Sequence, residues 1–470
     1  MHPRDAIFLY GERSNTAQYF LTSFAFPDQR TFDREAVRTW LGDRARSLPS
    51  LHERVVRAPL DLTHPRLIAD VALDLNRHIY FHDISDWDEF CEFEGRMVMQ
   101  PGDRSRPLWE IHVVFGVTNV ADVLGECVMV TIKLHHSIAD GQLSVDIARH
   151  LFAAEVPSAP SPDIVESSAP SRWFGGKALP VLGSVGSVPR GIYALTRRLR
   201  TVGGIESDLK AEVANGDYLI PQRRAAPTIV NRELGPRRAV GHVFFDLRDL
   251  KALKTAIGGV TVNDILLTVL SGALYSYLQG NGEEVRTLFS TVPVATRASE
   301  PGQQSLNQFS AMRVDLHIDE PNLVERVAAI HTSVLEERKR SGSPANIAQR
   351  RVIEDVPGYV YRAVTAYTAF LAKKTPTVST NTGISNVPKG LGADYVLCGV
   401  ESGASFGVVA LDGRMGVAHS IGTLGDLLAL NITVDPDQLP DLDAYRALIW
   451  KSFTDLREQV ALSFDVDSMV

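Results

Sequence analysis

Two adjacent histidines, His135 and His136, stand just before Asp140 and Gly141 in the stretch Lys133–Gln142 (KLHHSIADGQ). A histidine at the end of a strand, with its ring neutral, has the right pKa to take a proton from an alcohol near pH 7. The acid could belong to a catalytic triad or brace a tight turn by pairing with an arginine. The glycine could let the backbone bend and a ligand approach. These residue types therefore favour proton abstraction from a hydroxyl group.

The elements that must position the pair are predicted to be a strand, a tight turn and a helix. The strand covers residues 126–136, and apolar residues at helical spacing predict the helix over 142–152. Neighbouring strand residues point to opposite faces, so the two rings cannot readily share a metal ion, and we predict no metal site. The alternative is two core histidines followed by Asp140 as a helix N-cap, and spacing alone does not decide between the two.

Length and composition restrict the class of protein. The 470 residues predict two domains of about 200 residues each. A net charge of −8 argues against a nucleic-acid partner. The three cysteines (Cys91, Cys127 and Cys398) show no paired spacing, which predicts a reducing compartment. Because neither a signal peptide nor an apolar run of about 18 residues is visible, we expect a cytoplasmic protein that spans no membrane.

Composition shifts along the chain predict an N-terminal domain over 1–155, a Pro/Ser-rich crossover linker over 156–235 and a C-terminal domain over 236–470. Further elements are predicted within them: a helix over 86–98 with Ser85 and Asp88 as its capping box, a strand over 108–117, and a strand followed by a helix over 239–254.

One basic amphipathic stretch, Ser187–Val202, interrupts the linker. Its apolar residues fall at helical spacing, and its positive charge comes from Arg190, Arg197, Arg198 and Arg200. This is the composition of a helix that lies in a membrane interface. An ordinary surface helix that packs one stripe on a domain has the same pattern, so both interpretations stay open.

The histidine motif is not isolated. His135, His136, Asp140 and Gly141 match the HHxxxDG signature of the CoA-dependent acyltransferase superfamily. Four more blocks, in order, resemble the bacterial wax ester synthase/diacylglycerol acyltransferase family: DAIFLY (5–10), PLWEIHVVFG (107–116), TVND (261–264) and STVPVATR (290–297). SNVPKG (385–390) resembles a fifth, although Lys389-Gly390 replaces the family's Gly-Pro. The segment after DAIFLY also lacks the family's Met-His.

The resemblance covers nearly the whole chain and implies a fold and a mechanism. The fold would be α/β, with two chloramphenicol-acetyltransferase-like domains, each a mixed sheet with flanking helices, and an active-site tunnel between them. His136 would be the general base that activates an acceptor hydroxyl for direct attack on the acyl-CoA thioester. Since a thiol of pKa about 8.5 leaves readily, neither an acyl-enzyme nor a cofactor beyond the acyl-CoA substrate is needed. His135 would support His136.

Other site residues follow from the same resemblance. Asp140 and Gly141 would be structural, with Arg297 as the partner of Asp140, although an ordinary exposed arginine is the alternative. Asn263 and Trp109 are our candidates for lining the substrate site. Asp264 is explained locally, because TVND also reads as a capping box on Thr261.

A second motif is rejected. GASFG (403–407) fits the G-x-S-x-G nucleophile elbow around Ser405, but that motif needs a strand followed by a sharp turn and a helix. The following residues instead predict a hairpin that turns at Asp412-Gly413.

The predicted activity is O-acyl transfer from long-chain acyl-CoA to diacylglycerol or a fatty alcohol, giving triacylglycerol or wax ester. The predicted partners are these substrates and a membrane or lipid-droplet surface to which the protein binds peripherally. The alternatives are a related enzyme that acylates a polyketide or glycolipid alcohol, and a non-catalytic lipid-binding protein of the same fold. A peptide-synthetase condensation domain is disfavoured because no carrier domain follows.

Overall fold

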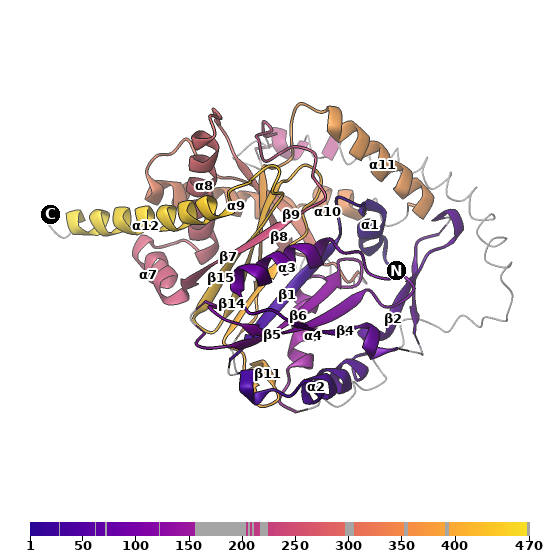
Figure 1. Cartoon of the computed structure of the whole chain (residues 1–470). Helices are drawn as coiled ribbons and strands as arrows, with labels where there is room; N and C mark the ends of the chain where they lie inside the picture. The colour runs from indigo at the N-terminus through magenta and orange to yellow at the C-terminus, as the bar shows by residue number, and fades with distance from the viewer. Residues whose placement is uncertain are drawn as a thin grey trace.

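The computed structural model of this chain contains two mixed β-sheets with helices around them (Figure 1). It describes residues 1–27, 29–61, 63–70, 73–121, 123–155, 204, 207–208, 211–216, 224–296, 305–351, 356–390 and 394–467. The predicted basic stretch Ser187–Val202 and Arg297 lie outside the described residues.

The first sheet has the strand order β13-β1-β6-β5-β4. In that order the strands are Ala404–Val408, Tyr19–Phe26, Cys127–His135, Trp109–Val117 and Ile79–Asp83. All neighbours are antiparallel except β4 and β5. The predicted strands over 108–117 and 126–136 are confirmed as β5 and β6.

The second sheet has the order β7-β15-β14-β10-β8-β9. These strands are Ala239–Asp246, Leu427–Val434, Val417–Leu424, Thr382–Pro388, Phe289–Ala295 and Phe309–Asp315. Two small hairpin-like pairs complete the strands: β2 (Glu53–Val56) with β3 (Arg66–Ala69), and β11 (Val396–Leu397) with β12 (Val400–Glu401).

The helices of the N-terminal half are α1 (Pro3–Gly11), α2 (Arg34–Arg46), α3 (Trp87–Met99) and α4 (Gly141–Leu151). Those of the C-terminal half are α7 (Leu247–Ile257), α8 (Val262–Gly280), α9 (Leu323–Ser341), α10 (Pro344–Arg351), α11 (Gly358–Lys374) and α12 (Leu442–Asp467). Helices α7, α8, α9 and α12 share one hydrophobic core with the second sheet. Helix α3 packs against both β1 and β7, so it lies between the two sheets (Figure 1).

The predicted mixed α/β fold with two sheets is confirmed, and several local predictions with it. The strand and helix predicted over 239–254 are β7 and α7, and the helix predicted over 142–152 is α4. The N-cap predicted for α3 was wrong, because the Asp86 side chain, rather than Ser85, accepts hydrogen bonds from the N–H groups of Asp88 and Glu89.

The hairpin predicted after GASFG was also wrong. Asp412 and Gly413 do form a turn, but β13 before it joins the first sheet and β14 after it joins the second. Ser405 lies inside β13 and pairs with Phe24 of β1, so it is not at a strand-to-helix turn. A strand from the C-terminal half thus completes the sheet of the N-terminal half.

A buried polar group also joins the two halves. Glu94 of α3 contacts the His242 ring of β7 (Oε2–Nε2 3.0 Å) and accepts a 2.6 Å hydrogen bond from the Ser23 hydroxyl of β1. Within the described ranges no single helix has the length and apolar character to cross a bilayer. Helices α7 and α8 meet that test only as a pair, bent by 98°.

Candidate active site

The two histidines of the HHxxxDG motif diverge at the end of β6, as the strand alternation predicts. The His136 ring stacks on Phe8 of α1, with ring centroids 4.8 Å apart, and contacts Phe20 of β1 at 4.7 Å. Its main chain is held on both sides: the N–H donates to the Gln18 carbonyl (2.8 Å), and the carbonyl accepts from Asn307 Nδ2 (2.7 Å). The main chain of His136 is therefore fixed, and the residue as a whole is partly buried.

His135 faces a separate and completely buried environment. Its Nδ1 accepts a 3.0 Å hydrogen bond from the Ser137 N–H and lies 2.7 Å from the Ser137 hydroxyl. A ring nitrogen that accepts from an N–H carries no proton, so the proton of the neutral ring is on Nε2, which lies 3.7 Å from the Glu12 carboxylate. His135 thus orders the turn after β6, and its support of His136 stays a prediction.

The surroundings of His136 keep its ring neutral. Burial, with a smaller contribution from neighbouring His135, lowers the pKa of His136 to about 3. The Nδ1 atom is buried and has no hydrogen-bond partner among the described residues. A neutral imidazole has a lone pair free for the proton of a bound hydroxyl group, which is the chemistry predicted for this residue, although so low a pKa makes it a weaker base than a histidine that titrates near pH 7.

This low pKa predicts an unusual pH profile. The His136 ring stays neutral in the folded protein while a free histidine becomes protonated below about pH 6.5, so activity that depends on the neutral ring should persist down to about pH 5. Because the folded pKa is depressed, the stability contributed by this group is present above about pH 6.5 and is lost as pH falls toward the folded value. Measuring kcat/KM from about pH 5 to pH 8, with unfolding monitored in parallel, tests this; half-loss of activity near pH 6.5 without unfolding would contradict it.

Asp140 braces the turn after β6. Its Oδ1 accepts from the Leu143 N–H (2.8 Å) as the N-cap of α4, and its Oδ2 accepts from the Gln308 N–H (3.3 Å). Asp140 is therefore the N-cap of α4. The pairing of Asp140 with Arg297 stays a prediction, since Arg297 is outside the described residues.

Asp5 of α1, which no sequence pattern marked as a site residue, joins this site to residues 305–307 of the other half of the chain. The buried Asp5 carboxylate accepts hydrogen bonds from the Ser305 hydroxyl (2.7 Å) and from the Leu306 N–H (3.1 Å). It also accepts from the Asn307 N–H and side-chain amide (both 2.9 Å), and that amide in turn donates to the His136 carbonyl. Asp5 opens the DAIFLY block, which was a visible signal, but no local pattern indicated its partner.

Gly141 serves close packing in this structure, and the approach of a ligand to it stays a prediction. A Cβ atom at Gly141 would lie 2.8 Å from Val387 Cγ2 of β10, well inside van der Waals contact. The glycine therefore lets the first turn of α4 press against the SNVP strand of the other half.

We expect Gly141→Ala to lower the free energy of unfolding by about 1–2 kcal/mol, because the stiff Val387 side chain cannot easily move away. Val387→Ala should restore most of that loss in the double variant. Denaturant unfolding of the four proteins in this cycle tests the contact, and purely additive changes would show that the two side chains do not meet.

Asn263 meets the SNVP strand as well. Its side-chain oxygen accepts a 2.6 Å hydrogen bond from Asn386 Nδ2, which joins the start of α8 to β10. The capping box is confirmed, with Thr261 as N-cap and the Asp264 carboxylate accepting from the Thr261 N–H. Asp264 Oδ2 also lies 2.8 Å from the His331 ring, so this acid is structural, and the lining role of Asn263 stays a prediction.

Lys389, where the chain departs from its resemblance, is buried between the two sheets. Its ammonium donates to the Ser405 hydroxyl (2.6 Å) and to the Phe406 carbonyl (3.2 Å), both on β13. Burial lowers the pKa of Lys389 to about 7. The replacement therefore adds a polar tie between β10 and β13 and leaves the strand that carries Asn386 intact.

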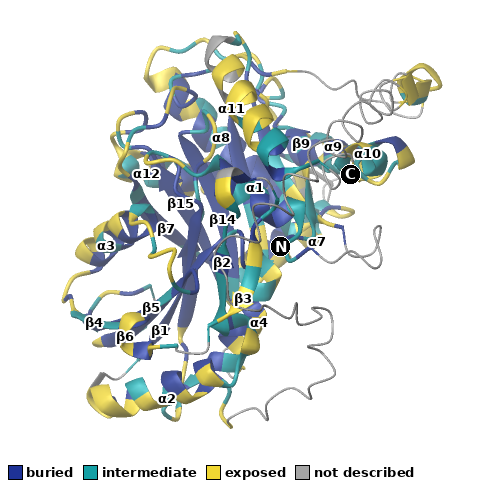
Figure 2. Ribbon diagram, turned by 90° about the vertical axis from the view of Figure 1, so that its right-hand side faces the viewer, coloured by how far each residue is buried: buried dark blue, intermediate teal, exposed yellow. Residues whose placement is uncertain are grey.

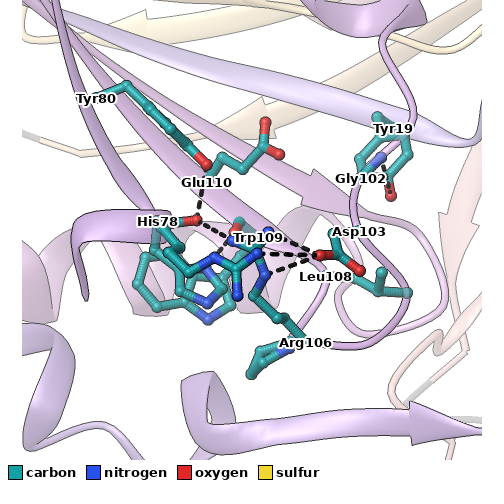
Figure 3. A pocket seen from close by; sticks show the side chains of 11 residues that line it. Tyr19, His78, Tyr80, Gly102, Asp103, Arg106, Leu108, Trp109 and Glu110 are labelled. Atoms are coloured by element: carbon teal, nitrogen blue, oxygen red, sulfur yellow. Dashed lines mark hydrogen bonds and ion pairs between the residues drawn. The ribbon is translucent and has the colours of Figure 1, made fainter. Parts of the chain in front are cut away.

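Trp109, the second lining candidate, belongs to the hydrophobic core. Its indole N–H donates to the Leu51 carbonyl (2.7 Å) and its ring stacks on His78 with centroids 4.2 Å apart. A small cavity with a volume of about 30 Å³ lies beside Trp109 and Tyr19 (Figure 3). Trp109 is therefore packed in the core with its polar atom already bonded, and its role in lining the substrate site stays a prediction.

Two family models match the chain. The model described as the wax ester synthase/diacylglycerol acyltransferase catalytic domain matches residues 1–266, and the one described as the WS/DGAT C-terminal domain matches residues 306–457. A Mycobacterium tuberculosis protein named as a diacylglycerol O-acyltransferase is 27% identical over 453 residues, which are 93% of this chain and 86% of the relative.

Solved structures agree on the fold. The wax ester synthase/diacylglycerol acyltransferase from Marinobacter aquaeolei VT8 superposes with a TM-score of 0.67 at 18% identity and covers 98% of both chains. A trichothecene 15-O-acetyltransferase from Fusarium sporotrichioides has a TM-score of 0.52 at 13% identity, covering 96% of this chain and 94% of its own. At such identities the likeness shows the fold alone.

Proposed function

Because this chain belongs to the wax ester synthase/diacylglycerol acyltransferase family, we propose that it transfers a long-chain acyl group from acyl-CoA to the hydroxyl of diacylglycerol or a fatty alcohol, with His136 as general base. The family makes the protein an O-acyltransferase. The observation that carries the finer proposal is the neutral His136 ring, packed between Phe8 and Phe20.

The reaction follows from this arrangement. The His136 ring takes the hydroxyl proton as the acceptor oxygen attacks the thioester carbonyl carbon, and a tetrahedral oxyanion forms. The carbon–sulfur bond then breaks, CoA leaves as the thiolate, and the protonated ring returns the proton to sulfur. The products are an ester and free CoA, and the balance requires no cofactor beyond the acyl-CoA substrate.

The acceptor is proposed on two grounds. The similar Mycobacterium tuberculosis protein bears the name of a diacylglycerol O-acyltransferase. In addition, the His136 ring is flanked by aromatic side chains, which suits an apolar acceptor. A polyketide or glycolipid alcohol is the alternative acceptor, and a non-catalytic lipid-binding protein is the alternative function.

Incubation with labelled palmitoyl-CoA and an equimolar mixture of hexadecanol and dioleoylglycerol tests the proposal. We expect labelled triacylglycerol, wax ester or both, with release of one CoA per ester formed. CoA release with ester formed only from a polyketide or glycolipid alcohol would identify the alternative acceptor. No transfer to any alcohol, with palmitoyl-CoA or lipid still bound, would support the non-catalytic alternative.

The proposed substrates are oily and are dissolved in a lipid phase. We therefore propose that the protein acts while bound peripherally to a membrane or lipid droplet on the cytoplasmic side. The arginine-rich stretch Ser187–Val202 was predicted to make this contact. That prediction stays open, because the stretch lies outside the described residues.

A further inference from the structure

Helix α11 presents an apolar face to solvent. Val364, Tyr367 and Leu371 lie at helical spacing along one side of it, and their side chains are 50%, 61% and 41% exposed. Residues 363–372 contain no charged side chain. Single exposed apolar residues are ordinary on soluble proteins. Three of them aligned on one exposed helix indicate a surface that binds another molecule or a membrane when the protein functions. Figure 2 shows the helix largely in the colour of exposed residues, beside α1.

The start of α11 is anchored firmly while the apolar part projects. A Cβ atom at Gly358 would lie 2.5 Å from the Tyr10 hydroxyl of α1, so the helix begins in direct contact with α1. The Tyr361 ring packs on the Tyr10 ring (5.8 Å), and Arg362 donates to the buried Asp61 carboxylate (2.8 Å). The exposed face is therefore held at a set position and does not hang from a loose segment.

The charge of α11 is one-sided. From Gly358 to Lys374 the helix contains Arg362, Lys373 and Lys374 and no acidic residue, in a chain whose net charge is −8. Arg362 is paired with Asp61, but Lys373 and Lys374 follow the apolar residues directly in the sequence. An apolar, tyrosine-containing stretch next to basic residues is typical of a helix that lies in the headgroup region of an anionic bilayer. A protein partner with a basic or mixed surface would not be favoured by this charge.

We propose that α11 docks the enzyme on an anionic phospholipid bilayer, with Val364, Tyr367 and Leu371 inserted below the headgroups. This inference rests on the proposed function, which requires substrates dissolved in a lipid phase. Helix α11 packs on α1, and α1 carries Phe8 against the His136 ring. With the enzyme docked through α11, only helix α1 would therefore lie between the docking helix and the catalytic histidine.

Vesicle co-sedimentation of the full-length protein tests this docking without any need for catalysis. The vesicles contain phosphatidylcholine and phosphatidylglycerol at 3:1, with pure phosphatidylcholine as the comparison. The triple variant Val364→Gln, Tyr367→Gln, Leu371→Gln should bind at least about tenfold more weakly than wild type, because three apolar side chains no longer gain from insertion. A matched control, Leu124→Gln, Leu335→Gln, Leu462→Gln, removes three exposed leucines elsewhere and should bind as wild type does.

Two further measurements complete the test. Tyr367→Trp should give a blue shift of tryptophan emission on adding the anionic vesicles, and added salt should weaken binding. Activity of the triple variant should fall on vesicle-borne diacylglycerol and stay unchanged on a short, water-soluble alcohol.

The outcomes separate the two proposals. Wild type that does not bind the vesicles, or a triple variant that binds as well as wild type, would overturn docking through α11. A triple variant with a lower Tm than the control in the absence of vesicles would show that the chain itself covers this face, and would also overturn it. Vesicle binding that depends on α11, without acyl transfer to any acceptor, would leave docking in place and remove the proposed function.

Discussion

Replacing His136 with alanine should lower acyl transfer by about 10²- to 10⁴-fold, the usual contribution of a general base. The loss should appear in kcat with a short soluble alcohol as well as with lipid acceptors, because proton removal from the hydroxyl is common to both. The fold should survive, since the main-chain contacts of His136 with Gln18 and Asn307 do not involve its ring.

His419→Ala is a suitable control for this experiment. The His419 ring is also buried, and burial lowers its pKa to about 4, but it lies in the second sheet against Tyr445. This variant should lose stability without a specific loss of turnover. A His136→Ala protein that keeps more than about a tenth of the wild-type rate would remove His136 from the role of base.

Asp5→Ala should cost both stability and turnover, because it leaves the donors of Ser305, Leu306 and Asn307 without their shared acceptor. Each buried donor left unsatisfied costs about 1–3 kcal/mol, so we expect the free energy of unfolding to fall by at least about 3 kcal/mol. Asn307 would then release the His136 carbonyl, and kcat should fall even at temperatures where the variant is folded.

Asp33→Ala provides the comparison, because Asp33 also accepts a main-chain hydrogen bond but at the exposed N-terminus of α2. Loss of an exposed N-cap costs about 1 kcal/mol and should leave kcat unchanged. If Asp5→Ala and Asp33→Ala had the same small effect on unfolding and kcat, the loop after residue 304 would not depend on Asp5.

Much of the site was predictable from local sequence patterns. Runs of β-branched residues predicted β5 and β6, and the alternation of strand side chains predicted that His135 and His136 would face different surroundings. The capping pattern of Thr261 and Asp264 predicted the start of α8. Each of these features depends on residues a few positions apart, so a local sequence pattern is enough to predict it.

The features that were missed depend on contacts between distant residues. Asp5 and Asn307 are 302 positions apart, and nothing near either one indicates the other. The Asp412-Gly413 turn was identified, but the partner of β13 was not, because the exposed edge of β1 competes with the local strand β14. The packing of Trp109 was not visible in its motif either, because its indole bonds to Leu51, 58 positions away.

The position of β13 limits how this protein can open. Its five residues are paired with β1 in one sheet, and the chain continues through only residues 409–416 to β14 in the other. Lys389 of the second sheet is bonded to β13 as well. A hinge motion that swung the two halves apart as rigid bodies would have to break this ladder or stretch a short connection. Admission of an oily acceptor is therefore expected to depend on small, local displacements of side chains and of helices such as α1, on the nanosecond-to-microsecond scale, and not on slow domain closure.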